Sequence, residues 1–349
     1  MSLENNTVLS NINVYPVKSI KGLSISSSMV EKQGLTFDRR FMIAKPDGAM
    51  VTARVYPQLV KVEASLLPEG LWLTYADKEP LKLTVSSFSM KEKSTQVWND
   101  RFVAYETTDE ANRWFSDILG ESVELVYTGA QSNRNREKLG HNVSFADGYP
   151  LLVISQASLD ELNKRASEHH VMEQFRPNVV VSGSEPFIED SWKRIRIGSV
   201  EFEIRKPCER CILTTVDPAK GDMKTSKEPL KTLSQFRANE KGAVYFGQNL
   251  VALNEGMIQV GDPIEVLETK DKEYYQDNSC ESLKLTCVGK EEIAKEFVTY
   301  WFEPTHGVLP SYMPGQYLPI EIVVEGEKLG RYYTLSSSPS RMGRYAISI

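Results

Sequence analysis

The residues best suited to chemistry are two cysteines, Cys208 and Cys211, with two residues between them. Lys206 and Arg210 flank this pair, and a strand-forming run at residues 200–204 comes directly before it. Cationic neighbours favour the thiolate form of a cysteine, and the thiolate is both the nucleophile and the metal ligand. The Thr-Thr and Asp-Pro pairs that follow are typical of a turn. The stretch therefore predicts a reactive loop at the end of a strand.

Three other interpretations of the cysteine pair remain open. A zinc site needs further ligands, but Cys280 and Cys287 lack the required spacing and lie far along the chain. A redox dithiol of the thioredoxin kind sits at the start of a helix, which the β-branched run after Cys211 and Pro218 disfavours. The third alternative is a pair of purely structural thiols.

Composition limits the classes of protein that fit. The chain has 349 residues, which favours two or three domains, and 41% hydrophobic residues, which is ordinary for a soluble protein. A net charge of −6 disfavours nucleic-acid binding through a broad basic surface. The sequence contains no apolar run long enough for a membrane span and no signal peptide. Four cysteines do not form a disulfide framework. We expect a cytoplasmic protein with no nucleic-acid or membrane partner.

The elements that must position the cysteines are mainly strands. Short alternating runs separated by turn residues predict a compact barrel over the first 125 residues, with strands at 8–14, 41–44, 59–65, 71–74 and 81–85. One helix is predicted at 108–120, because Thr108 can cap it, acidic residues follow and Gly120 can end it.

The next region, residues 126–268, again has mostly strand patterns. A helix is predicted at 155–168 with Ser155 as its cap, and strands are predicted at 179–182, 194–204 and 259–267. Residues 269–282 are polar without periodicity and predict a linker, after which a separate module begins at residue 283. The fold class expected is mainly β, of the β-barrel type, with peripheral helices.

The cysteine loop, Cys-Glu-Arg-Cys-Ile-Leu-Thr-Thr-Val-Asp-Pro, closely resembles that of the MOSC family, and the nearest relatives look like bacterial YcbX proteins and mitochondrial amidoxime-reducing components. The resemblance covers residues from about 10 to 268 and implies an N-terminal MOSC β-barrel domain at 8–125 and a MOSC β-barrel domain at 126–268. It also implies that Cys211 ligates molybdenum held by a molybdopterin, whereas Cys208 matches a second cysteine that is not the ligand.

A molybdopterin ends in a phosphate or nucleotide, so an acidic chain must supply cations and amides locally. The motifs at 15–22, 37–41, 51–54 and 175–179 match the family as they stand here. The motif at 147–150 fills the place of a family loop around the molybdopterin, but Gly148 and Tyr149 replace a small polar pair that is usual in the mitochondrial proteins. Together with the cysteine loop, they imply these cofactor contacts: Lys18, Ser19, Arg40, Thr52, Arg54, Asp147, Gly148, Tyr149, Arg176, Asn178 and Arg210.

The last part of the chain carries a second resemblance. Arg331-Tyr-Tyr-Thr-Leu-Ser-Ser and the upstream Met313-Pro-Gly-Gln-Tyr match the flavin-binding signature of the ferredoxin–NADP reductase superfamily. The match implies that Arg331 meets the FAD diphosphate and that Tyr333 and Thr334 lie by the flavin ring. Because the chain stops at Ile349, inside an expected strand, we expect residues 283–349 to be a partial flavin barrel of a longer parent.

These resemblances imply a molybdenum-dependent reductase of small N-hydroxylated compounds, such as hydroxylaminopurines or amidoximes. Electrons would come from a flavin or iron–sulfur module, which the longer parent would carry as a fused reductase. A sulfur carrier or cofactor-handling protein, with a persulfide on Cys211, is the rival hypothesis, since a reactive thiolate suits both tasks.

Overall fold

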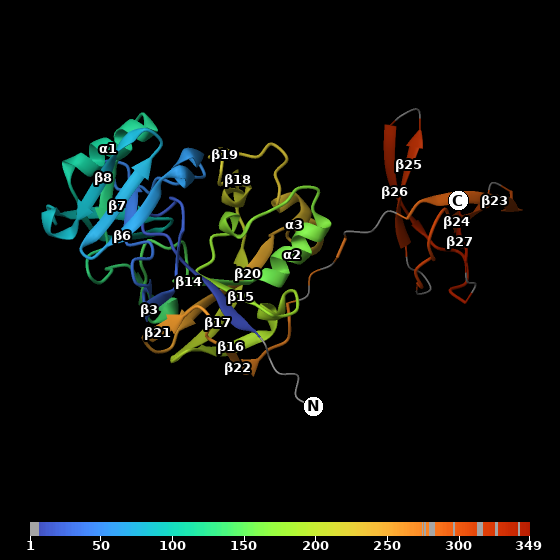
Figure 1. Ribbon diagram of the computed structural model, residues 1–349. Helices are drawn as coiled ribbons and strands as arrows, with labels where there is room; N and C mark the ends of the chain where they lie inside the picture. Colours follow the sequence, from blue (N-terminus) through green and yellow to red (C-terminus); the bar gives the residue numbers. More distant parts are fainter. Residues whose placement is uncertain are drawn as a thin grey trace. The chain divides into compact units, whose positions relative to one another are not determined.

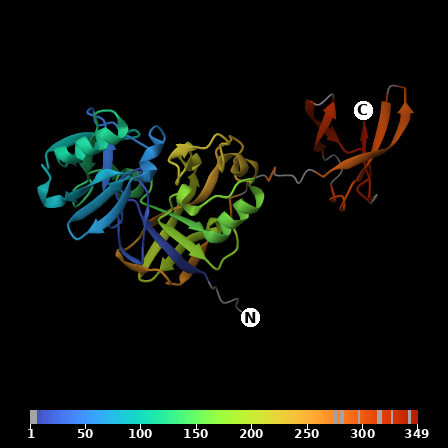
Figure 2. The same ribbon diagram turned by 45° about the horizontal axis from the view of Figure 1, so that its top comes forward.

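The computed structural model describes residues 7–273, 275, 277–278, 283–295, 297–312, 317–324, 327–340 and 343–349. The chain forms two compact units, residues 1–278 and 279–349. Strands dominate both, as the sequence predicts, and the first unit also carries the helices α1 to α3 (Figures 1 and 2). None of the helices in the described ranges is long and apolar enough to cross a membrane.

The N-terminal part of the first unit consists of two curled sheets and α1 (Asp109–Leu119). One sheet has the order β5 (Phe41–Ala44), β11 (Glu124–Tyr127), β10 (Asp100–Glu106) and β9 (Glu92–Val97). The other has the order β6 (Glu63–Leu67), β7 (Gly70–Tyr75) and β8 (Lys78–Thr84). Their apolar side chains pack around Trp114 and Phe115 of α1 in one core.

The ends of α1 follow the predicted signals. The Thr108 hydroxyl accepts a hydrogen bond from the backbone N–H of Ala111 at 3.1 Å, and Gly120 adopts a left-handed conformation with φ 70°. The predicted strand at 59–65 is wrong in its first half. Residues Pro57–Lys61 form a 3-10 turn and β6 begins only at Glu63, because a proline fixes φ at a helical value and favours the first position of a helical turn.

A large sheet occupies the second part of the unit. Its order is β2 (Leu23–Ile25), β1 (Val8–Val14), β15 (Val179–Ser182), β14 (Leu151–Ser155), β20 (Tyr245–Ala252), β17 (Val200–Glu209), β16 (Trp192–Ile197) and β22 (Ile264–Thr269). The predicted strand at 194–204 is two strands, β16 and β17, which turn at Gly198 with φ 55°. The predicted strand at 259–267 is likewise divided between β21 (Gly256–Gln259) and β22.

Smaller strands complete the unit. One small sheet has the order β21, β3 (Ser27–Glu31) and β4 (Gly34–Leu35). Two further sheets are hairpins, one of β12 (Asn135–Arg136) with β13 (His141–Asn142) and one of β18 (Val216–Asp217) with β19 (Asp222–Met223). The helices α2 (Gln156–Arg165) and α3 (Leu230–Phe236) cover the large sheet with Leu159, Leu162 and Phe236. Ser155 caps α2 as predicted, but the helix ends at Arg165 because Ala166 is extended.

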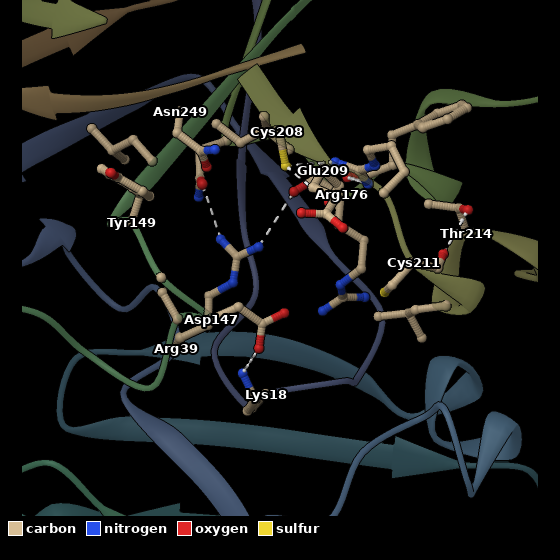
Figure 3. A pocket seen from close by; sticks show the side chains of 18 of the residues that line it. Lys18, Arg39, Asp147, Tyr149, Arg176, Cys208, Glu209, Cys211, Thr214 and Asn249 are labelled. Carbon is tan, nitrogen blue, oxygen red and sulfur yellow. Dashed lines mark hydrogen bonds and ion pairs between the residues drawn. The ribbon is translucent and has the colours of Figure 1, made fainter. Parts of the chain in front are cut away.

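The first strand joins the two parts of the unit. β1 pairs with β15 in the large sheet, and the chain then crosses to the N-terminal sheets, where the Lys18 N–H donates to the Phe41 carbonyl at 2.8 Å. Residues 15–20 therefore run along the junction between the two parts. The loops before β6, β14 and β15 and the end of β17 meet the same junction (Figure 3).

A buried ion pair stabilises the framework behind β17. Arg237, which follows α3, donates to one carboxylate oxygen of Asp190 at 2.7 Å, and Gln248 of β20 donates to the other oxygen of Asp190 at 2.7 Å. The side chains of Arg237 and Asp190 are both buried. Arg237→Met would leave a buried carboxylate without its cation, so we expect a loss of about 3–5 kcal/mol in the unfolding free energy, measured by urea denaturation. The control is Arg196→Met, which removes surface ion pairs with Glu201 and Glu265 and should cost about 1 kcal/mol or less. Equal losses would contradict this account.

The segment predicted as a linker makes contacts up to residue 278. Asp277 pairs with Arg165 at 2.5 Å, and the Asn278 N–H donates to the Gln235 carbonyl at 2.6 Å. The ring of Tyr275 lies 4.3 Å from the Arg237 guanidinium. The first residues after β22 are therefore held against α2 and α3.

The second unit is built from hairpins. One sheet has the order β23 (Leu285–Ala294), β24 (Phe297–Pro304) and β27 (Tyr345–Ser348), and β25 (Tyr317–Val324) pairs with β26 (Glu327–Thr334). Of the flavin signature, Met313 to Gln316 and the side chain of Arg331 lie outside the described residues. Tyr333 packs on the small core of this unit and Thr334 is exposed.

Candidate functional site

A cavity of about 270 Å³ lies at the junction in the first unit and brings most of the predicted site residues together (Figure 3). Ten of the predicted residues line it: Lys18, Ser19, Arg54, Asp147, Gly148, Tyr149, Arg176, Asn178, Arg210 and Cys211. Seven cationic side chains face two carboxylates in the lining, the cations being Lys18, Arg39, Arg54, Arg136, Arg176, Lys206 and Arg210. In a chain of net charge −6, this local excess of positive charge makes the cavity suited to an anion.

The cysteine loop forms one wall. Strand β17 ends at Glu209, which pairs with Tyr245, and Cys211 begins a 3-10 turn. The backbone N–H and the hydroxyl of Thr214 both donate to the Cys211 carbonyl, at 3.1 and 2.9 Å. These bonds fix the backbone of Cys211, and Figure 3 shows its side chain among those that line the cavity.

The two sulfurs have different surroundings. The Arg54 Nε–H donates to Cys211 Sγ at 3.3 Å, whereas Cys208 Sγ accepts from Arg210 at 3.1 Å and packs against the core between α2, α3 and the sheet. Cys208 lies within β17 and Cys211 follows its end. Cys211 is therefore the sulfur placed to react, and Cys208 has a structural environment.

A chain of charges links the cysteine to the other side of the cavity. Asp147 accepts from Lys18 at 2.5 Å and from Arg54 at 3.0 Å, and Arg54 is the residue that contacts Cys211. Partial burial opposes ionisation of Asp147, but the charges of Lys18 and Arg54 outweigh it and hold its pKa well below the ordinary range. Asp147 is thus a carboxylate that orients two cations.

Two further arginines stack on one tyrosine. The guanidinium groups of Arg39 and Arg176 lie 4.2 and 4.1 Å from the centre of the Tyr15 ring. Arg39 also donates to the Asn178 side chain at 3.0 Å, and Arg176 donates to the Ile20 carbonyl at 2.7 Å. Burial lowers the pKa of Arg176 to about 10 and raises that of Tyr15 to about 12. The stack therefore fixes two charged groups at the cavity wall near neutral pH.

Five predicted residues do not line the cavity. The Arg40 guanidinium points away and donates to the Gly129 and Ala130 carbonyls. The buried Thr52 instead starts the turn that carries Arg54, since its carbonyl accepts from Val55 and Tyr56. The other three, Arg331, Tyr333 and Thr334, belong to the second unit.

Sequence reasoning missed some of the lining. Arg39 lines the cavity, although the motif match indicated its neighbour Arg40 as the cofactor contact. Asn249 of β20 also lines the cavity, but it lies in no motif that the sequence analysis identified. Glu209 and Lys206 are next to the cysteines, and their proximity was the available signal. Arg134, which stands in an exposed-looking polar run, is fully buried and donates to the Asp147 carbonyl at 2.8 Å, so it holds the loop that bears Asp147.

Lys18 makes anion binding sensitive to pH. Burial, aided by Arg54 and opposed by Asp147, lowers the pKa of Lys18 to about 8. As the pH rises through this value the cavity loses one positive charge, so its affinity for sulfate, whose own charge stays constant, should fall about tenfold between pH 7 and pH 9. Calorimetric titration would measure this. Lys18→Met should bind sulfate weakly at both pH values, and an equally steep fall in that variant would contradict the assignment.

The surroundings of Cys211 limit how a metal could be held. In the parts of the chain that the structure describes, no group of three His, Cys, Asp or Glu side chains is placed to hold a metal ion. A metal bound to Cys211 would therefore need ligands from a bound molecule.

The chain matches known protein families over most of the first unit. Residues 6–122 match the MOSC N-terminal beta barrel domain and residues 140–265 match the MOSC domain. Mitochondrial amidoxime reducing component 2 of Rattus norvegicus is 35% identical over 278 residues, which cover 73% of this chain and 82% of that protein. Mitochondrial amidoxime-reducing component 1 of Mus musculus is 34% identical over 73% of this chain and 80% of that protein. The component 1 protein of Homo sapiens is 32% identical over 73% of this chain and 81% of that protein. The chain therefore belongs to the family of MOSC-domain proteins that includes the mitochondrial amidoxime-reducing components.

Proposed function

We propose that this protein is a molybdenum-cofactor-dependent reductase that converts N-hydroxylated compounds to the corresponding amines or amidines. The observation that carries the proposal is the position of Cys211, whose half-buried sulfur lies on the wall of a cation-rich cavity and is contacted by Arg54 at 3.3 Å. The names of the relatives supply the reaction class, since they are amidoxime-reducing components.

The residues of the cavity fit a molybdopterin. A thiolate suits a thiophilic metal that brings its own sulfur ligands, and Cys211 would supply the protein's ligand. The phosphate end needs cations, which Arg39, Arg176 and Arg210 provide. When bound, the cofactor supplies a two-electron couple, so that the N–O bond breaks, two protons are taken up and the oxygen leaves as water.

The protein's own task is to hold the reacting region in one geometry. Arg54 is fixed between Cys211 and Asp147, and Asp147 is fixed in turn by Lys18. The Arg54 guanidinium can donate to an oxygen that develops negative charge beside Cys211, because its orientation is set before a substrate arrives. Preorganised donors of this kind lower the barrier without a cost of reorientation.

The test is the composition and turnover of protein purified from molybdate-fed cells. We expect about one molybdenum and one pterin per chain, and reduction of benzamidoxime and a hydroxylaminopurine with reduced viologen as the electron donor. Protein without molybdenum or pterin would contradict the proposal. A persulfide on Cys211 in such protein, seen by mass spectrometry, would favour the sulfur-carrier hypothesis instead.

The second unit belongs to the proposal as a source of electrons. Its Arg-Tyr-Tyr-Thr run at 331–334, on β26, supports a flavin-domain origin, with Arg331 toward the FAD diphosphate and Thr334 toward the ring. We propose that electrons reach the first unit from a flavin, directly or through an iron–sulfur centre. Removing the residues after 278, where the first unit ends, should leave viologen-driven turnover unchanged, and loss of that turnover would place part of the reaction in the second unit.

A further inference from the structure

Three large exposed apolar side chains belong to residues that adjoin Arg54 or Cys211 in the sequence or contact Arg54. Val55 follows Arg54 and is 69% exposed, Ile212 follows Cys211 and is 51% exposed, and Trp98 is 46% exposed. Arg54 contacts Cys211 at 3.3 Å, and the Trp98 ring contacts Arg54, so Trp98 lies near the point at which this sulfur meets its cation. Exposed apolar groups gathered at one place usually mark a binding surface.

Trp98 is the most firmly placed of the three. It lies in the turn between β9 and β10 with a φ of 54°, a left-handed conformation that favours glycine over a bulky residue. Its ring lies 4.6 Å from the Arg54 guanidinium, and its indole N–H donates to Asp147 at 3.2 Å. A hairpin of the N-terminal sheets thus presents an aromatic ring beside the residue that contacts Cys211.

The same tryptophan forms a wall of a second hollow. This depression has a volume of about 500 Å³ and is lined by Trp98, Asn99, Asp100, Asn135, Arg136 and Glu137. Arg136 also lines the cation-rich cavity, so the two hollows are neighbours. The depression has one cation, Arg136, where the cavity has seven, and its other side chains are an aromatic ring, amides and carboxylates, which can accept hydrogen bonds from N–H groups.

Building on the proposed function, we propose that this depression is the substrate subsite and that Trp98 is its stacking platform. A flat ring lies on the exposed part of the indole, and the N-hydroxyl group attached to the ring points toward Cys211. Among N-hydroxylated compounds, the platform would therefore favour those on a planar aromatic or heteroaromatic body over aliphatic ones. The cation-rich cavity remains for the anionic cofactor, so cofactor and substrate enter neighbouring sites of opposite character.

The kinetic test compares two substrates that share the reacting group, benzamidoxime with a ring and acetamidoxime with a methyl group. In the holoenzyme, Trp98→Leu should raise KM for benzamidoxime about three- to tenfold and leave KM for acetamidoxime within twofold. Trp98→Phe should restore most of the affinity because it keeps a ring. The matched control is Trp72→Leu on β7, which removes a 40% exposed tryptophan that lines neither hollow and should change neither KM.

Trp98 also touches Arg54, so a purely structural role must be distinguished. Such a role predicts an equal loss of kcat/KM for both substrates in Trp98→Leu, and that result would overturn the subsite. A second readout needs no turnover: benzamidine, the product of benzamidoxime, should bind the wild-type protein at least threefold more tightly than Trp98→Leu in calorimetry. Equal affinities would also overturn it. Absence of molybdenum or turnover in the wild-type protein would instead contradict the reductase, while the benzamidine titration would still test the platform.

Discussion

Cys211→Ala should abolish both molybdenum retention and viologen-driven turnover, whereas Cys208→Ala should keep most of both. The structure gives the reason: both cysteines line the cavity, but only Cys211 lies after the end of β17 with its sulfur against Arg54. Cys208 lies within the strand, where its sulfur accepts from Arg210 and packs on the core. Loss of Cys211 would remove the proposed protein ligand of the metal, and among the described residues no group of three His, Cys, Asp or Glu side chains offers another metal site.

The two variants control each other, since both remove one sulfur from the same loop. Metal analysis and a pterin assay on protein of equal folded fraction would measure retention, and thermal denaturation would show that the fold is intact. Cys211→Ser should lose the activity too, because a hydroxyl is a harder and weaker ligand for a thiophilic metal. Full activity in Cys211→Ala would sink the reductase mechanism, and equal losses in both variants would mean that the loop needs both thiols.

The local elements were predictable because their signals are local. The cap of α1 at Thr108 and its end at Gly120 depend on neighbouring residues, and both were confirmed. The cysteine loop was predictable for the same reason, since strand, cations and turn residues follow one another in the sequence. A local pattern failed where a single residue changed the geometry, as at Pro57, whose ring favours a 3-10 turn in place of a strand.

The lining of the cavity was less predictable because long-range pairing determines it. The position of Lys18 depends on β1, which pairs with β15 about 170 residues away, and no local pattern indicates that partner. Arg134 has the composition of a surface loop, yet it is buried because it meets Asp100 and the carbonyls of residues 144 to 147. Such contacts are visible only when the strands have been assembled.

The clearest case is the pair Arg39 and Arg40. Phe37 and Arg39 have left-handed φ values of 69° and 48°, so the backbone turns sharply before β5 and the two arginines point to different sides. Arg39 enters the cavity beside Asn178, whereas Arg40 binds the carbonyls of Gly129 and Ala130. A motif match cannot distinguish adjacent residues of one type, although the structure separates their environments.

This difference gives the second large prediction. Arg39→Gln should lower the affinity for the molybdenum cofactor by about tenfold or more, because it removes a charge-assisted donor from the anion-binding wall. Arg40→Gln should retain the cofactor in every folded molecule but lower the unfolding free energy by about 1–3 kcal/mol, because the buried Gly129 carbonyl and the partly buried Ala130 carbonyl lose their donor. Molybdenum and pterin per folded chain after dialysis, with the folded fraction from circular dichroism, would separate the two effects.

Arg39→Gln should remain folded although it removes the partner of the buried Asp38. Burial already raises the pKa of Asp38 while Arg39 lowers it, so without Arg39 the carboxyl group would take up a proton rather than remain as an isolated buried charge. Arg39→Lys should recover part of the cofactor affinity, since it keeps the charge but not the forked donor. Loss of the cofactor in Arg40→Gln and its retention in Arg39→Gln would contradict this assignment. The cofactor contact would then belong to Arg40, and the anion would lie on the side of the loop at 37–41 that faces Gly129.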